Sequence, residues 1–128
     1  MVHRIHNVGV AKQIGSYSDA IETASNLRWF YTSGTPGLTE AGELPPDIEK
    51  QSEIAWAHVM KMLGQAGMTA PDIVKVTQYL TRAEDIADYA KVRTRFLGEA
   101  RPASMLLVIP QLVWPKILVE VEIVAAKA

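Results

Sequence analysis

The clearest structural pattern in this chain is Arg101-Pro102-Ala103-Ser104-Met105-Leu106-Leu107-Val108-Ile109, followed after a turn by Ile117-Leu118-Val119-Glu120-Val121-Glu122-Ile123-Val124-Ala125. β-Branched and aliphatic residues dominate Met105–Ile109 and Ile117–Ala125, which predicts two strands there. Side chains alternate between the two faces of a strand. In the second segment one face carries Val119, Val121 and Ile123, and the other carries Leu118, Glu120, Glu122 and Val124. Ionised carboxylates on so apolar a strand are costly unless they are paired, so Glu120 and Glu122 call for a functional explanation.

Two amphipathic helices are predicted upstream of these strands. The first begins near Pro45-Pro46-Asp47, continues with apolar residues at helical spacing, and stops at Gly67. The second is opened by Thr81-Arg82-Ala83-Glu84, which has the form of a capping box. Its apolar face is expected to carry Ile86, Tyr89, Ala90, Phe96 and Leu97. Between the helices, Ile73–Leu80 is β-branched and partly alternating, which predicts a strand.

Two short strands are predicted before the first helix, at Tyr17–Thr23 and Leu27–Ser33, and we expect them to pair as a hairpin. A surface loop follows between Thr35 and Pro46 because glycine and proline are frequent there. Strands separated by amphipathic helices predict an α+β fold, with one mixed β-sheet and both helices packed on one face. The other face is too apolar to remain exposed to solvent, so we expect further copies of the chain to cover it.

Length and composition exclude several classes of protein. We expect 128 residues to form one domain, spanning residues 1–128. Thirteen basic residues against 14 acidic ones give no excess of positive charge that would indicate nucleic-acid binding. No apolar run is long enough to cross a membrane. The start, Met1–Arg4, lacks the apolar core of a secretion signal, and the chain has no cysteine. We therefore expect a cytoplasmic protein.

No metal or cofactor site is predicted. His3, His6 and His58 do not form a ligand set, since two lie on an expected strand and one on a helix. The chain also has no phosphate-binding loop, nucleophile elbow or dinucleotide fingerprint.

Glu120 and Arg93 are the main candidates for a functional site. Glu120 either faces solvent at a sheet edge or lies in a cleft, where a raised pKa makes a carboxyl group useful as a general acid or base. Arg93 lies seven residues after Ile86 and three before Phe96, near the middle of the apolar face of its helix. It either extends to the helix rim or points into a cleft. In a cleft it would pair with Glu120 or Glu122, or bind a ligand carboxylate.

Three weaker candidates each have an ordinary structural alternative. Tyr17 is either a core or interface tyrosine or a catalytic group. Ser33-Gly34 ends a strand, where free backbone N–H groups either bind an anionic oxygen or simply turn the chain. Arg101 precedes Pro102, which holds it extended, and it either flanks the strand in solvent or contacts a substrate.

Six segments, in order along the chain, resemble segments of the RidA/YjgF family, also called endoribonuclease L-PSP-like. They are Ile14-Gly15-Ser16-Tyr17-Ser18, Tyr31-Thr32-Ser33-Gly34, Asp47-Ile48-Glu49-Lys50-Gln51, Ile73-Val74-Lys75-Val76-Thr77, Arg101-Pro102-Ala103 and Val119-Glu120-Val121-Glu122-Ile123. The resemblance implies a chorismate-mutase-like fold and a homotrimer with a central barrel and three ligand clefts between subunits. It also implies cofactor-free hydrolysis of reactive enamines or imines to carbonyl compounds and ammonia.

The resemblance implies roles for four residues. Glu120 would position the attacking water or move protons, and Tyr17, Ser33 and Gly34 would complete the pocket. Family members have also been described as ribonucleases, but the balanced charge of this chain gives that activity no support.

The chain departs from the family at Ser104, where relatives carry the arginine that holds the substrate carboxylate. Arg93 is the candidate to replace that guanidinium, and Trp114 in the following turn is expected to reshape the pocket. Two hypotheses remain. In the first, the protein is an imine or enamine deaminase that uses Arg93 and Glu120. In the second, the trimer binds a small, flatter or less acidic metabolite without hydrolysing it, and Ser104 and Trp114 shape the cleft.

Overall fold

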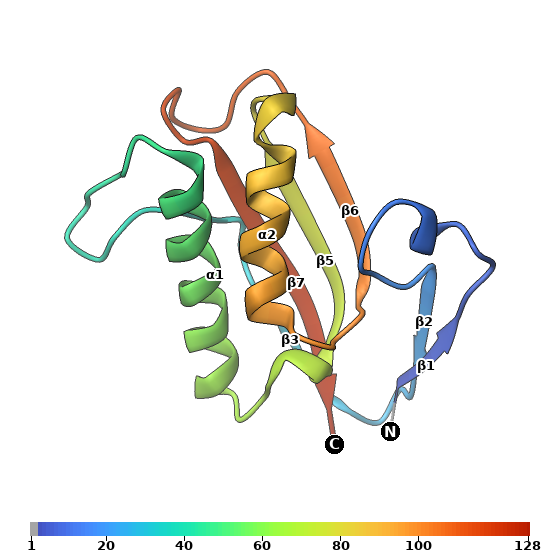
Figure 1. The fold of residues 1–128 in the computed structure, drawn as a ribbon. Coiled ribbons are helices and arrows are strands. Elements are labelled where there is room, and N and C mark those ends of the chain that lie inside the picture. Colours follow the sequence, from blue (N-terminus) through green and yellow to red (C-terminus); the bar gives the residue numbers. More distant parts are fainter. Residues whose placement is uncertain (1–2) are drawn as a thin grey trace.

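The computed structural model describes residues 3–128, so Met1 and Val2, at the start of the segment expected to lack a secretion signal, lie outside the described residues. The helices and strands are, in chain order, β1 (His3–His6), β2 (Ala20–Thr23), β3 (Arg28–Tyr31), β4 (Thr35–Pro36), α1 (Ile48–Gln65), β5 (Ile73–Leu80), α2 (Ile86–Leu97), β6 (Ala103–Val108) and β7 (Val119–Lys127). Figure 1 shows α1 and α2 side by side across one face of the sheet that contains β5 and β7. This is the α+β arrangement that the sequence predicts.

The main sheet is mixed. Its strands follow the order β3-β7-β5-β6, and the short β4 also pairs with β7. Only β5 and β6 run parallel, because α2 connects them as a crossover helix. The remaining pairs in this sheet are antiparallel. A smaller ribbon of β1 and β2 lies next to β6, where Ser18 forms a parallel bridge to Ala103.

The predicted hairpin between the two early strands is wrong. β2 pairs with β1, where His3 lies opposite Thr23, and β3 pairs with the C-terminal β7. The His3 ring supports the first pairing by a contact of 2.8 Å with Thr23 Oγ1, and a second contact of 3.0 Å with the Asp72 carbonyl ties β1 to the segment before β5. On β3, Phe30 packs against the core. Strand propensity located these segments, but tertiary packing chose their partners.

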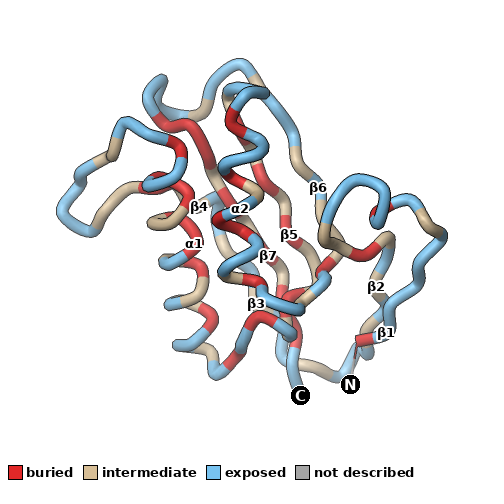
Figure 2. Tube along the Cα trace, in the orientation of Figure 1, coloured by how far each residue is buried: buried red, intermediate tan, exposed pale blue. Residues whose placement is uncertain are grey.

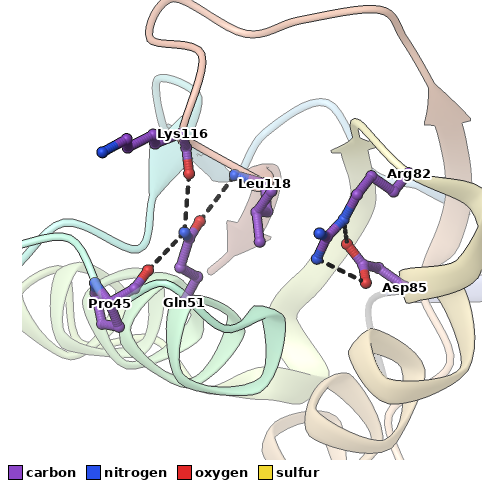
Figure 3. Close-up of polar contacts among 6 residues, drawn as sticks. All are labelled: Pro45, Gln51, Arg82, Asp85, Lys116 and Leu118. Carbon is purple, nitrogen blue, oxygen red and sulfur yellow. Dashed lines mark hydrogen bonds and ion pairs between the residues drawn. The ribbon is translucent and has the colours of Figure 1, made fainter.

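Helix α1 begins and ends as predicted. The Asp47 side chain caps it by accepting from the Lys50 N–H at 3.3 Å, and Gly67, with φ of +72°, lies just beyond its end. Gln51, fully buried in the first turn of α1, holds this end against the segment before β7. Its amide donates to the carbonyls of Pro45 and Lys116, and its oxygen accepts from Leu118 N–H (Figure 3).

The predicted capping box before α2 does not form. Thr81 N–H instead donates to the Leu118 carbonyl, which extends the β5–β7 pairing. A 3₁₀ turn at Ala83–Asp85 follows, and Arg82 pairs with Asp85 through contacts of 2.7 and 3.1 Å (Figure 3). The helix therefore begins at Ile86.

The core lies between the helices and the sheet, where buried segments of α1, α2, β5 and β7 face one another (Figure 2). On β7, Val119, Val121 and Ile123 are buried, as the alternation predicts, and the opposite side chains are half-buried. On α2, Tyr89 and Leu97 belong to the core. Ile86 does not, because it is 38% exposed at the start of the helix.

Candidate functional site

A pocket of about 440 Å³ lies where α2 and β6 meet the segment before β2. Nine residues line it: Ile14, Gly15, Tyr17, Ile86, Ala90, Arg93, Ser104, Met105 and Leu106. Three of the candidates from the sequence, Tyr17, Arg93 and Ser104, are therefore brought together. The other lining side chains are mainly apolar.

The Arg93 guanidinium lies at this pocket and does not extend along the helix rim, since the residue is only 8% exposed. Its Nη1 donates to Gln78 Oε1 at 3.2 Å, and its buried Nε has no hydrogen-bond partner within residues 3–128. Gly15 lies beside the guanidinium, since a Cβ at this position would be in van der Waals contact with Nη2 at 3.7 Å. Arg93 forms no ion pair with a carboxylate of the described residues, so the alternative in which it pairs with Glu120 or Glu122 does not occur within one subunit.

Gln78, which was not among the site residues predicted from the sequence, connects Arg93 to Ser104. It is fully buried on β5, and its amide nitrogen donates to Ser104 Oγ at 3.0 Å and to the Met105 carbonyl at 2.9 Å. Its oxygen also accepts from Tyr89 OH at 2.7 Å, and Trp56 Nε1 donates to that hydroxyl at 3.3 Å. A buried polar network therefore extends from the core to the pocket wall.

A signal for Gln78 was present in the sequence. Period-two alternation places it on the same face of β5 as Val76 and Leu80, both fully buried. An amide between two core residues requires hydrogen-bond partners, so the strand pattern gave a weak signal for this position.

Burial of Tyr89 raises the pKa of its hydroxyl far above the ordinary value, so this group stays protonated as a donor.

The two carboxylates of β7 form a second group of functional candidates. Glu122 accepts a hydrogen bond from Tyr79 OH at 2.9 Å, and this bond raises the pKa of the tyrosine. Partial burial raises the pKa of Glu120, and the charge of Glu122 adds to the effect. Gly34 lies directly against the Glu120 carboxylate, where a Cβ would collide with Oε1. Gly34 is thus beside Glu120, and Ser33 precedes it in the chain.

The sheet register separates these two groups. Gln78 lies opposite Val121, and both point toward the helices. Tyr79 lies opposite Glu120, one residue further along, and so on the other face. We call Tyr17, Arg93 and Ser104 the pocket group, and Ser33, Gly34 and Glu120 the carboxylate group. The two groups lie on opposite sides of the sheet.

Two further candidates from the sequence lie away from both groups. Arg101 Nη1 donates to the carbonyls of Gly98 and Ala100 at the end of α2. It lines a different, mainly apolar cavity of about 300 Å³, which β1 and β2 form with the end of α2. Trp114 is half exposed in the β6–β7 loop, where its carbonyl accepts from Ile117 N–H. The structure therefore does not join either residue to the pocket of its own subunit.

Among residues 3–128, no three His, Cys, Asp or Glu side chains gather where they could hold a metal ion. Nor does that part of the chain contain a helix with the length and apolar character needed to cross a bilayer.

Residues 9–127 match the model of a protein family described as Endoribonuclease L-PSP. The chain belongs to this family, RidA/YjgF. A RutC family protein of Pyrococcus abyssi is 34% identical over 118 residues, which cover 91% of this chain and 90% of that protein. TdcF of Escherichia coli, named "Putative reactive intermediate deaminase", is 30% identical over 87 residues, 67% of this chain and 65% of that protein.

The solved structure of YyfB from Yersinia pestis, a member of the Rid family, has a TM-score of 0.87 to this chain at 24% identity. The match covers 99% of this chain and 100% of that one. The fold is therefore that of the RidA/YjgF family.

Proposed function

We propose that this protein is a RidA-type deaminase that hydrolyses a reactive enamine or imine to a carbonyl compound and ammonia. We infer a single-domain cytoplasmic protein that works as a homotrimer without a cofactor. The observation that carries the proposal is the division of candidate residues between two sides of one sheet. A cyclic assembly brings different surfaces of neighbouring subunits together, so the pocket group of one subunit can meet the carboxylate group of the next.

The uncovered face of the sheet supports such an assembly. Tyr31, Met105 and Leu107 are large, apolar and exposed on β3 and β6. They flank the half-buried strand positions that carry Glu120 and Glu122. Apolar surfaces of this kind, bordered by polar groups, mark protein–protein interfaces.

Arg93 supports the proposal by supplying a cation where the family arginine is replaced by Ser104. Its guanidinium lines the pocket, is almost completely buried, and has no acidic partner among residues 3–128. A buried guanidinium in this state favours an anionic ligand, and its planar donors match a carboxylate. We therefore assign the substrate carboxylate to Arg93.

Glu120 supplies the proton transfers in this account. Water adds to the carbon of the C=N bond, and the resulting amino alcohol loses ammonia to give the carbonyl compound. The first step needs a base near the water and the second needs an acid near the nitrogen. The raised pKa of Glu120 brings its ionisation closer to neutral pH, which suits a group that serves in both steps.

The test is ammonia release from 2-imino acids generated in situ by an amino acid oxidase. We expect the wild-type protein to accelerate decay of the imine, and Glu120→Gln to lose at least about 100-fold in rate, as is typical when a general acid–base is removed. Glu22→Gln, a matched change on exposed β2, should retain the wild-type rate. Imine decay that is no faster with protein than without it would contradict the proposal.

The same separation of the two groups also allows a second function, binding without hydrolysis. The pocket with Arg93 and Ser104 lies within one subunit, whereas Glu120 is on the other side of the sheet. A trimer whose carboxylate group does not reach the ligand would bind a small acid and leave it unchanged. Thermal stabilisation by such acids, without turnover of any imine, would favour this function.

A further inference from the structure

The hydrogen bonds around Gln78 have only one possible direction. An indole nitrogen is a donor only, so Trp56 Nε1 donates to Tyr89 OH. The single proton of Tyr89 is then free for Gln78, at 2.7 Å. Arg93 is also a donor only, so the Gln78 atom that faces both residues must be the carbonyl oxygen.

The other end of Gln78 confirms this orientation. The Met105 carbonyl is an acceptor only, so the Gln78 atom that faces it must be the amide nitrogen, at 2.9 Å. The second proton of this nitrogen goes to Ser104 Oγ, at 3.0 Å. Both lone pairs of the Gln78 oxygen and both protons of its nitrogen are therefore used, and the amide cannot turn over without leaving buried groups unpaired.

The fixed orientation of the Gln78 amide also determines which hydrogen bonds Ser104 can make in the pocket. Its oxygen accepts from Gln78, and its own proton goes to no group of residues 3–128. Ser104 lines the pocket, as does Arg93, whose Nη2 lies beside Gly15 and makes no hydrogen bond within residues 3–128. The polar wall built on Gln78 thus presents donors to a ligand.

We propose that Gln78 is a positioning residue that makes this pocket selective for planar carboxylates, by holding Arg93 and Ser104 as two donors at the two ends of one amide. The inference rests on the proposed function and deepens it. One carboxylate oxygen binds Arg93 and the other accepts from Ser104. The serine therefore binds part of the carboxylate that the family arginine holds in relatives. The remaining walls are apolar, among them Ile14, Ile86 and Leu106, and they select a substituent without a second charge.

Binding of 2-oxobutanoate and of its neutral primary amide, measured by isothermal titration calorimetry, tests this selectivity. The wild-type protein should bind the carboxylate at least about tenfold more tightly than the amide, because charge-assisted hydrogen bonds are the stronger ones. Gln78→Glu should remove this preference. A carboxylate at position 78 neutralises Arg93 and takes the Ser104 proton, while the size of the side chain is kept.

The matched control is Gln65→Glu, the same chemical change at the exposed end of α1, which should keep the preference. A second pair of variants decides the matter if Gln78→Glu does not fold. Ser104→Ala should weaken binding of 2-oxobutanoate about tenfold, whereas Ser104→Thr retains the hydroxyl and should stay within about threefold of wild type.

Unchanged carboxylate preference in Gln78→Glu, or equal binding by Ser104→Ala and Ser104→Thr, would overturn the inference. The outcome is separable from that of the proposed function. Selective binding of 2-oxobutanoate without imine hydrolysis would support the role of Gln78 in holding Arg93 and Ser104 as donors, and would contradict the proposed deaminase activity. Imine hydrolysis together with equal binding of the acid and the amide would contradict the proposed role of Gln78, and would support the deaminase activity.

Discussion

The helix-covered face of the main sheet presents hydrogen-bond donors at a pocket, whereas the opposite face presents carboxylates. On the first, Arg93 and Ser104 are connected by a buried amide and have no acidic partner within the described residues. On the second, Glu120 and Glu122 are half-buried and close enough for the charge of one to raise the pKa of the other. Holding and hydrolysing an imino acid needs both chemistries, and the register of β5 and β7 keeps them apart in each subunit. In the proposed trimer, the two halves meet between copies.

The largest effect is expected from disrupting the face that carries the carboxylates. Leu107 lies opposite Tyr79 in the β5–β6 pair and shares its face. Leu107→Asp places a charge on the surface that neighbouring subunits would cover, and desolvating an unpaired charge costs several kcal/mol. We expect dissociation into monomers and complete loss of imine hydrolysis, measured by sedimentation velocity and ammonia release. Val113→Asp, in the exposed β6–β7 loop, should leave the molecular mass unchanged. If the Leu107→Asp protein stays trimeric, the face of the sheet that the helices leave open does not form the interface between subunits.

Removing the cation from the helix-covered face should have the next largest effect. Arg93→Ala eliminates the proposed carboxylate anchor and should lower kcat/KM for a 2-imino acid by about 100-fold, the upper range for hydrogen bonds to a charged group. Arg95→Ala is the matched control. Arg95 follows Arg93 on the same helix, but its side chain is exposed and lies near Glu49 and Glu53. Equal rates for the two variants would show that the anchor lies elsewhere.

The smallest expected effect concerns the stability contributed by Glu120. A raised pKa means that the folded chain holds this proton more tightly than the unfolded chain. The resulting stability is present below the ordinary value of 4.5 and is lost as the pH rises through the folded pKa. Glu120→Gln should therefore be slightly more stable than wild type at neutral pH, by less than about 1 kcal/mol because the group is partly solvated.

Urea denaturation of both proteins at neutral pH and below the ordinary Glu pKa provides the measurement. The gain in the free energy of unfolding should disappear at the lower pH. A gain that persists there would point to a cause other than ionisation of Glu120.

Local periodicity was sufficient to predict α1, α2 and the two faces of β7, because each depends on residues close in sequence. The pairing of β3 with β7 was not predictable in this way, because the partners lie far apart in the sequence, with Phe30 opposite Ala125. The capping box before α2 failed for a similar reason. The backbone of Thr81 is engaged by Leu118, far along the chain.

The candidate site was partly predictable because Arg93, Glu120 and Ser104 each break a local pattern: a cation on an apolar helix face, a carboxylate on an apolar strand, and a serine in a family motif. Gln78 was missed because an uncharged amide disturbs a strand pattern only weakly. Its role also depends on its partners. Gln51 is equally buried, but it bonds three backbone groups and holds α1 in place, whereas Gln78 bonds side chains that line a pocket.

The most direct test of a site shared between subunits is complementation in mixed trimers of Arg93→Ala and Glu120→Gln chains. Each variant alone should be inactive. Random reassembly of equal amounts pairs an intact Arg93 with an intact Glu120 of the neighbouring subunit at about one site in four, so about a quarter of the wild-type rate of ammonia release should return. If both residues act from the same subunit, or if they do not share a site, mixing will restore no activity, and the account will be wrong.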